Sequence, residues 1–521
     1  MPTPPSSTPS LVSWRDSRLG ANLDMSSTKG PIFTAFVLIL IVSGVGWVSK
    51  LLHLFRKQTD YLERGMDIFT EMKTKTPNKP FKLTTLLGDI TVLPRQFIDP
   101  IRNDKSLSFR RAITRDFHAH LPGFEAFAFL AHPTQILPIV LRKQLTKYLN
   151  TVTEPLSSEA SFATHHIFGE SRDWQKTLAY DSLLDLIARL SSRVFLGDEI
   201  CRNEDWLKVT KNYTVISFAS AAKLNVAPAP LRPLMNWFDP SCKEVRANLN
   251  QARRIISPVI EKRRQLKAKA MAAGQPVPTF NDAIDWAETE CQGKPYDAAV
   301  FQLTLSFVAI HTSTDLLYNT MMYLVKRPEF IDALRQEIIG VLRAEGWKKT
   351  ALYNMKLVDS ALKEAQRLLP GDVLTMRRQA VKDVTLPDGT VLQKGERIMV
   401  DNTHIRSAEL YSDPEEFDLY RFRNLRGQLG NENKAQFVST SPDHLGFGHG
   451  MYACPGRFFA SNELKVALCH LLLKYDWKLE DPSQAQTVMR GTNTIANPRV
   501  TLLFRRRKEE LDLETLGFGD S

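Results

Sequence analysis

A glycine-rich loop, FGHGMYACPG at residues 447–456, stands directly before a long apolar helical pattern that opens at Arg457. Its glycines permit tight turns and close approach of another backbone, and Pro455 ends the extended part of the loop. A cysteine just before a helix meets the positive end of the helix dipole and free backbone N–H groups, which favour the thiolate over the thiol. We therefore predict that Cys454 projects from this turn as an anion.

Three roles are open to Cys454: a buried structural thiol, a nucleophile or a metal ligand. The nearby His444 and His449 do not define a nucleophile and base pair, and the sequence contains no protease-type cysteine signature. A glycine-walled loop leaves room for a flat group, and a thiolate that projects from it suits an axial ligand to heme iron.

The composition narrows the class of protein. The 521 residues are 43% hydrophobic, so a large core is possible. The five cysteines are an odd number and contain no CxxC pair, which argues against a disulfide framework and a zinc site and favours a reducing compartment. The net charge is +11, but no dense Lys/Arg run with interleaved aromatic residues is present, so nucleic acid is not expected as a partner. Three interpretations of the positive charge remain: binding to an anionic membrane face, binding to an acidic partner protein, or basic residues scattered over the surface.

The N-terminal part of the sequence predicts a membrane anchor. Between Lys29 and Lys50 lie 20 residues without a charge, 30–49, which as a helix would reach about 30 Å, the thickness of one hydrocarbon core. A Pro/Ser-rich leader, 1–29, precedes them, which favours an uncleaved transmembrane anchor over a signal peptide. The flanking basic residues place the C-terminal side in the cytoplasm.

The rest of the chain predicts one large, mainly helical domain over 60–510 with a small β subdomain. Residues 88–94 read as a short strand and 385–401 as a strand-rich segment with hairpin turns. The proline-rich stretch 225–241 is predicted to be a mobile connection, and the charged end, with a tail at 511–521, to be frayed. The expected helices cover 134–149, 178–195, 249–274 and 296–326.

The pattern Phe447-Gly448-x-Gly450-x-x-x-Cys454-x-Gly456 resembles the heme-binding loop of the cytochrome P450 family, the heme-thiolate monooxygenases. The resemblance implies the cytochrome P450 fold and heme b with Cys454 as the axial thiolate ligand and as the metal-binding residue. It also implies dioxygen and NADPH-derived electrons as co-substrates. With the motifs below, the matches extend from residue 296 to about residue 478.

Three charged residues match the family's structural cluster. Glu364 and Arg367 in KEAQR are spaced so that their side chains can pair on one helix face, as in the family's ExxR helix. Arg421 in FDLYRF matches the arginine that joins this pair. The resemblance implies that the three are buried together and are structural, because losing one would leave an unpaired buried charge.

Two adjacent arginines are candidates for a heme propionate. Arg378 matches the family's propionate-binding arginine, with Arg377 as the alternative, and a guanidinium suits a carboxylate because it binds with two parallel hydrogen bonds. Tyr452 departs from the pattern, since the family commonly has arginine or histidine there, so heme retention is expected to depend more on Arg378. The family's Trp-x-x-x-Arg is missing too, and its nearest substitutes are Arg142 and Lys143.

The segment SFVAIHTSTDLL, 306–317, aligns loosely with the family's oxygen-activating helix and puts Thr312 at the threonine position. The resemblance implies that this hydroxyl holds water and passes protons. We expect it to bond the carbonyl four residues back. His311 stands where the family usually has an acid, and two interpretations remain open: a proton relay that titrates near neutral pH, or a histidine that only packs.

Two segments, 421–448 and 468–480, resemble filamentous-fungal enzymes of secondary metabolism, notably terpenoid oxidases. This resemblance implies a single-pass protein of the endoplasmic reticulum membrane with a cytoplasmic catalytic domain. The implied partners are NADPH-cytochrome P450 reductase, cytochrome b5 and a hydrophobic small-molecule substrate. The expected pocket lining lies in 86–133, 225–234 and 304–313. The alternatives are a monooxygenase for a polyketide or alkaloid, a heme-thiolate isomerase or dehydratase that needs no reductase, and a non-enzymatic scaffold.

Overall fold

The computed structural model describes residues 45–132, 135–145, 147, 149–484 and 487–517. The chain divides into two compact units, Met1–Arg56 and Lys57–Ser521. The predicted leader and all but the last five residues of the predicted anchor lie outside the described part. Within that part, one helix, α13 (Ala298–Leu324), is long and apolar enough to cross a membrane, and 72% of its apolar window is buried inside the protein.

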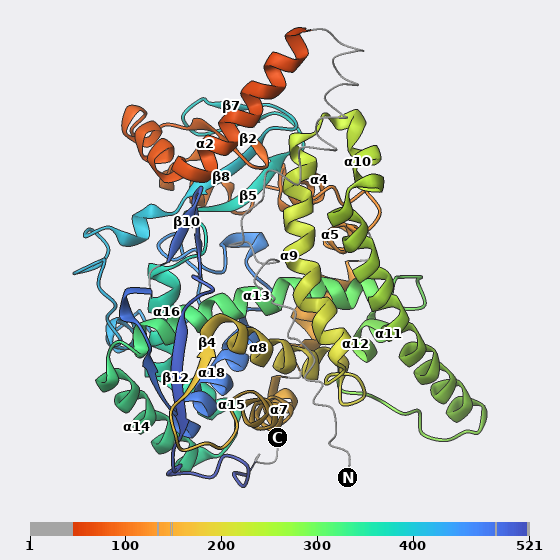
Figure 1. Ribbon diagram of the computed structural model, residues 1–521, viewed down its shortest axis with the longest axis vertical. Helices are drawn as coiled ribbons and strands as arrows, with labels where there is room; N and C mark the ends of the chain where they lie inside the picture. Colours follow the sequence, from red (N-terminus) through yellow and green to blue (C-terminus); the bar gives the residue numbers. More distant parts are fainter. Residues whose placement is uncertain (1–44, 133–134, 146, 148, 485–486, 518–521) are drawn as a thin grey trace, which may run out of the picture. The chain divides into compact units, whose positions relative to one another are not determined.

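Helices make up most of the second unit, as the sequence predicts (Figure 1). The longer helices are α2 (Val45–Lys75), α4 (Phe109–Asp116), α7 (Leu149–Phe168), α8 (Ala179–Leu196), α9 (Glu204–Val226), α11 (Pro240–Ala272), α12 (Ala283–Glu290), α13, α14 (Pro328–Glu345), α16 (Lys356–Leu368) and α18 (Arg457–Lys474). The shorter ones are η2 (Arg95–Phe97), α3 (Ile98–Ile101), α5 (Glu125–Phe129), α6 (Ile136–Ile139), η3 (Val140–Leu145), η4 (Ala229–Leu231), α10 (Arg232–Phe238), α15 (Lys349–Asn354), η5 (Thr403–Arg406), α17 (Arg421–Arg426), η6 (Gly450–Tyr452) and η7 (Pro482–Gln484).

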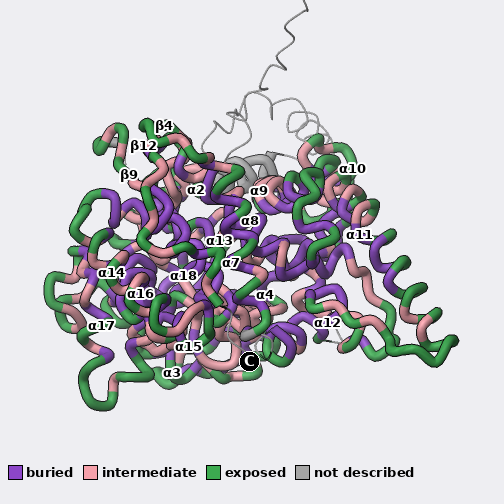
Figure 2. Tube along the Cα trace, turned by 90° about the horizontal axis from the view of Figure 1, so that it is seen from below, coloured by how far each residue is buried: buried purple, intermediate pink, exposed green. Residues whose placement is uncertain are grey.

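Helix α13 is the centre of the core. It begins where the Asp297 side chain accepts a hydrogen bond from the Val300 N–H at 3.0 Å, a normal N-cap. Most of its residues are buried because α8, α9, α11, α16 and α18 all pack against it. Figure 2 shows the buried residues concentrated along α13, α7, α8 and α18. The helix therefore holds its polar residues in a fixed place at the middle of the protein.

The strands form one larger sheet and three small ones. The larger sheet has the order β1-β2-β8-β5-β3, with β2 and β8 parallel and the other neighbours antiparallel. A second sheet has the order β4-β12-β9, and β6-β7 and β10-β11 are two-stranded. The bounds are β1 (Phe81–Thr85), β2 (Gly88–Leu93), β3 (Leu107–Ser108), β4 (Gln175–Leu178), β5 (Leu374–Ala380), β6 (Val384–Thr385), β7 (Val391–Leu392), β8 (Arg397–Asp401), β9 (Tyr475–Leu479), β10 (Val488–Arg490), β11 (Asn493–Ile495) and β12 (Thr501–Arg506).

A β-bulge interrupts strand β5. Thr375 pairs with Val400 and Arg378 with Ile398, so β5 carries one more residue than β8 across this interval. Met376 takes up the extra length in a left-handed conformation, with φ of 51°. After the bulge, Arg377 is partly exposed and Arg378 is buried.

Most predicted segments are confirmed by elements at the same place: 178–195 by α8, 249–274 by α11, 296–326 by α13, 88–94 by β2 and 385–401 by β6 to β8. The prediction of a mobile connection over 225–241 is wrong. Helices η4 and α10 occupy 229–238, because the prolines fall in the first turns of η4, α10 and α11, where a missing N–H costs no hydrogen bond.

The C-terminal residues pack more firmly than predicted. Leu513 is 1% exposed, and its carbonyl accepts a hydrogen bond from the Trp347 indole N–H at 2.9 Å. Lys474 also pairs with Glu514 at 3.3 Å. The prediction of a frayed C-terminal end is therefore wrong as far as Glu514.

Candidate functional site

The Cys454 loop has a backbone conformation that strongly favours glycine at two positions. Gly448 and Gly450 have φ of +66° and +76°, in the left-handed region. A Cβ on Gly450 would also lie 2.5 Å from the backbone oxygen of Arg102. The loop is closed by the Cys454 N–H, which donates to the Phe447 carbonyl at 2.8 Å. These contacts fix the direction of the cysteine side chain.

The surroundings of the Cys454 thiol act in two directions. Burial raises its pKa, whereas hydrogen bonds from the N–H groups of Gly456 and Arg457 lower it. Gly456 is the N-cap of α18, so these donors belong to the start of that helix. Burial has the larger effect, so the pKa of the thiol lies above its ordinary value, contrary to the predicted anion. The backbone donors offset part of this effect, and a bound metal cation would complete the deprotonation.

The predicted charged cluster is assembled and fully buried. The Glu364 carboxylate accepts two hydrogen bonds from Arg367, both at 2.8 Å, and one from Arg421 at 2.9 Å. Glu364 and Arg367 are 0% exposed and Arg421 is 7% exposed. The remaining arginine donors bond backbone carbonyls at Ile405, Ser412, Asp413, Pro414 and Glu416.

Arg378 is a buried cation without a carboxylate partner among the described residues. It is 3% exposed, one Nη donates to the Arg377 carbonyl at 2.8 Å, and its Nε has no partner. Its guanidinium lies 4.5 Å from the centre of the Tyr452 ring, and burial lowers its pKa to about 10. Tyr452 thus contacts Arg378 through its ring. A heme carboxylate would satisfy this cation.

The other basic residues considered for heme binding have partners within the protein. Arg377 pairs with Asp116 at 3.5 Å, so it is not left without an anion. Arg142 Nη2 donates to the carbonyl of Met451 at 3.4 Å, within the Cys454 loop, and Lys143 pairs with Glu290 at 2.9 Å.

Thr312 bonds the backbone of its own helix, as expected. Its hydroxyl donates to the Val308 carbonyl at 2.8 Å and lies 3.2 Å from the Ala309 carbonyl. The neighbouring His311 turns towards α9, with Nε2 3.1 Å from the Lys211 carbonyl. This contact joins α13 to α9 and favours the packing interpretation of His311.

Two acidic residues near Thr312 escaped the sequence analysis. Asp315, one turn further along α13, accepts a hydrogen bond from the Tyr180 hydroxyl at 2.8 Å. Its side chain has accessible surface, but the dense protein around it reduces its solvation and raises its pKa to about 6. Glu463 on α18 accepts hydrogen bonds from Ser191 at 2.5 Å and from Ser313, and burial raises its pKa to about 7. The i, i+3 spacing of Asp315 from Thr312 was a usable signal. Glu463 became visible only once α8, α13 and α18 were packed together.

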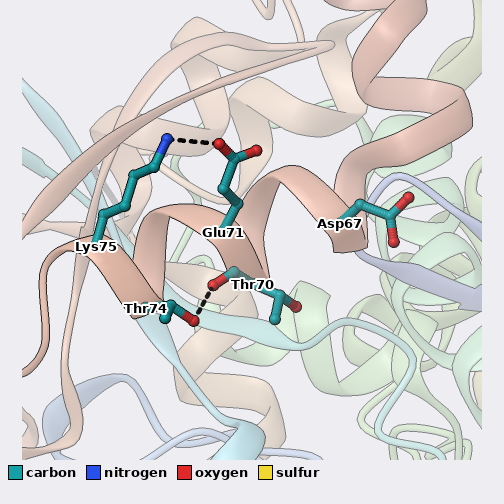
Figure 3. A pocket seen from close by; sticks show the side chains of 5 residues that line it. All are labelled: Asp67, Thr70, Glu71, Thr74 and Lys75. Carbon is teal, nitrogen blue, oxygen red and sulfur yellow. Dashed lines mark hydrogen bonds and ion pairs between the residues drawn. The ribbon is translucent and has the colours of Figure 1, made fainter.

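A shallow pocket along α2 lies apart from these groups. Figure 3 shows it lined by Asp67, Thr70, Glu71, Thr74 and Lys75. Its polar groups bond within the helix, with Lys75 to Glu71 at 2.5 Å and Thr74 to the Thr70 carbonyl at 2.8 Å. Nothing in it suggests chemistry.

Comparison with known proteins identifies the family. The family model for cytochrome P450 matches residues 176–504. Cytochrome P450 monooxygenase eqxH of Fusarium heterosporum is 45% identical over 497 residues, which cover 93% of this chain and 96% of that protein. The chain belongs to the cytochrome P450 family. Cytochrome P450 monooxygenase 1 of Gibberella fujikuroi is 44% identical over 84% of this chain and 99% of its own length.

The predicted cytochrome P450 fold is confirmed by a solved structure. The cyanobacterial CYP120A1 with bound retinoic acid superposes with a TM-score of 0.63 at 17% identity, covering 87% of this chain and 96% of that one.

Membership of the cytochrome P450 family implies heme with an axial cysteine thiolate, dioxygen and electrons from a reductase. The residues present fit this group. Backbone N–H groups at the start of α18 bond the Cys454 sulfur, and Arg378 is a buried cation without a carboxylate partner among the described residues. The heme supplies the activation of dioxygen, and the protein holds and orients it.

We expect Arg378→Gln to release heme about tenfold faster than wild type, because it removes a charge-assisted hydrogen bond to the propionate. Transfer of heme to excess apomyoglobin, followed by the Soret band, measures this rate. Arg377→Gln is the matched control and should change the rate much less, since Arg377 already pairs with Asp116. Faster heme loss from Arg377→Gln than from Arg378→Gln would contradict the assignment.

The buried carboxyl of Glu463 predicts a pH-dependent contribution to stability. Its pKa is about 7 in the folded protein against 4.5 as the ordinary value. The stabilisation by the bound proton is complete below the unfolded pKa and is lost as pH rises through the folded pKa. Wild type should therefore lose about 3 kcal/mol in free energy of unfolding relative to Glu463→Gln as the pH rises from below 4.5 to above 7. Urea unfolding across this range measures the difference, and a difference independent of pH would refute the prediction.

Proposed function

We propose that this cytochrome P450 is a membrane-anchored monooxygenase that inserts one oxygen atom from dioxygen into a hydrophobic secondary metabolite of a fungus. The observation that carries the proposal is the glycine-shaped loop of Cys454, whose Tyr452 contacts the buried Arg378, a cation without a carboxylate partner among the described residues. The two fungal relatives described above are named as cytochrome P450 monooxygenases, which supports the reaction class. A terpenoid is the proposed substrate class, supported by the resemblance of 421–448 and 468–480 to fungal terpenoid oxidases.

Thr312 is the proposed catalytic residue of the chain. Its hydroxyl, held by the Val308 carbonyl, would position a water molecule and pass protons to the oxygen being activated. Asp315, whose pKa of about 6 allows it to exchange protons near neutral pH, is the nearest acid along the same helix face. His311 would then position α13 against α9 through its bond to Lys211.

The proposed location is the endoplasmic reticulum membrane, with one span and a cytoplasmic catalytic domain. The uncharged segment 30–49 supports a span. On α10, the side chains of Leu234, Trp237 and Phe238 are 54%, 64% and 72% exposed, and their spacing puts them on one helix face, which suits contact with lipid. NADPH-cytochrome P450 reductase is the proposed electron donor, with cytochrome b5 as a second one, and the net charge of +11 suits acidic partners.

The test of the reaction class begins with the Cys454→Ala variant. Wild-type membranes should show a strongly red-shifted Soret band in the carbon-monoxide difference spectrum of the reduced protein, and the variant should lack it, because the band requires a thiolate ligand. Cys201→Ala is the matched control and should keep the band, since burial raises the pKa of that thiol to about 11. A folded, heme-supplied wild type without the band would refute the proposal.

We expect Thr312→Ala to consume NADPH but to release a much larger share of the reducing equivalents as hydrogen peroxide, because proton delivery loses its positioned hydroxyl. The ratio of peroxide formed to NADPH consumed measures this effect, with Thr314→Ala as the control from the same helix. A product that forms without NADPH or reductase would instead favour the heme-thiolate isomerase or dehydratase.

A further inference from the structure

A second group of arginines surrounds the carboxylate of Asp116 and is joined to the first through Arg377, whose carbonyl accepts a hydrogen bond from Arg378 at 2.8 Å. Asp116 is 2% exposed and pairs with Arg397 at 2.8 Å and with Arg377 at 3.5 Å. Arg115 and Arg232 complete the group, and their charges act on those of Arg397 and on one another. The cluster therefore holds four guanidinium groups. Among the described residues, Asp116 is the one carboxylate that forms an ion pair with any of them.

Neither Arg115 nor Arg232 forms an ion pair with a carboxylate of the described residues. Arg115 Nη1 donates to the Gly395 carbonyl at 2.7 Å, and Arg232 Nε donates to the Ala227 carbonyl at 3.0 Å. Burial and the neighbouring Arg397 lower the pKa of both guanidinium groups. Arg115 is nevertheless exposed and Arg232 is half-buried, so an anion from outside the chain can reach both.

Four parts of the chain meet at this arginine cluster. Asp116 ends α4, Arg377 and Arg397 lie on β5 and β8, and Arg232 begins α10 (Figure 1). The Asn225 side chain of α9 donates to the Asp116 carbonyl at 3.1 Å, which ties α9 to the same point. Segments 86–133 and 225–234, both expected to line the substrate pocket, thus come together here.

A row of aromatic rings leads from the arginine cluster to the central helix. The Arg377 guanidinium lies 5.9 Å from the centre of the Phe117 ring. Phe117 stacks on Phe127 at 4.6 Å, and Phe127 lies 4.9 Å from Phe307 of α13. Phe218 of α9 contacts Phe117 at 4.7 Å and is 39% exposed. Phe307 stands five residues before Thr312, so the aromatic row ends on the helix that carries the proposed catalytic residue, about one and a half turns before it.

We propose that the arginine cluster binds a carboxylate of the substrate, so that the preferred substrate is an apolar skeleton with an acidic group at one end. The skeleton would lie against Phe218, the exposed ring of the aromatic row, and Arg115 and Arg232 would hold the carboxylate with the paired donors that a guanidinium offers. Binding would also supply the negative charge that the cluster lacks. The inference rests on the proposed function, because it assigns an end to the substrate of the same monooxygenase.

The test uses ω-imidazolyl alkanoic acids of increasing chain length and their methyl esters as probes of the heme-loaded full chain. The imidazole binds the iron and shifts the Soret band, so binding is measured without knowing the natural substrate. We expect wild type to bind the acid about tenfold more tightly than its ester at one or more chain lengths, as a charge-assisted contact provides. The double variant Arg115→Gln/Arg232→Gln should lose this preference and keep its affinity for the ester.

Arg111→Gln is the matched control, because Arg111 is exposed on α4 one turn before Arg115 and its side chain forms no ion pair with a carboxylate of the described residues. It should keep the preference for the acid. Equal or weaker binding of the acid at every chain length would overturn the proposal. The carbon-monoxide spectrum of the same preparation tests the proposed function separately.

A lipid headgroup offers a similar anion, and vesicles with and without phosphatidylserine distinguish it. Loss of phosphatidylserine-dependent binding in the double variant, with no acid preference in wild type, would overturn the proposal in favour of a lipid site.

Discussion

The Glu364 carboxylate is the contact on which the heme-binding side of the protein depends. It holds Arg367 of its own helix and Arg421 of the following segment, and all three charges are shielded from water. Removing one partner of such a group costs about 3 to 5 kcal/mol, because a buried charge is left unpaired. Both arginines also bind carbonyls between residues 405 and 416, so one carboxylate fixes the chain that leads into the Cys454 loop.

Five arginines of this protein, some buried and some partly exposed, fall into two kinds. Arg367 and Arg421 have every requirement met by carboxylate and backbone oxygens, and they serve the fold. Arg378, Arg115 and Arg232 have no carboxylate partner among the described residues, although desolvation lowers the pKa of each. Since an unpaired, partly desolvated cation is unfavourable, its persistence points to a ligand that supplies the missing anion.

Much of this was predictable from sequence, and the exceptions have physical reasons. The turn glycines, the ExxR pair and the apolar periodicity of α13 are local patterns, so the loop, Glu364 with Arg367 and the central helix were all anticipated. The helix α10 was missed because proline was read as a breaker, whereas at the first turn it starts helices.

The arginine cluster could not be foreseen, because its members are separated by up to 282 positions and meet only through tertiary packing. Arg115 and Arg397 share no local pattern, and strand β8 brings the second beside α4. In the same way, Glu463 gained its raised pKa from the packing of three helices. Sequence patterns of short range thus predicted the heme ligand, and the tertiary fold revealed the arginine cluster.

The bulge at Met376 has a consequence for how this strand can change during evolution. Cross-strand partners point to the same face, so Arg378 follows Ile398, whereas Met376 and Arg377 share the space opposite Met399. Substitutions of Met376 preserve this arrangement, but a one-residue deletion would restore the plain ladder, leave Arg378 opposite Ile398 and place Arg377 directly opposite Met399. Relatives that keep both arginines in these roles should therefore vary here in residue type and not in strand length.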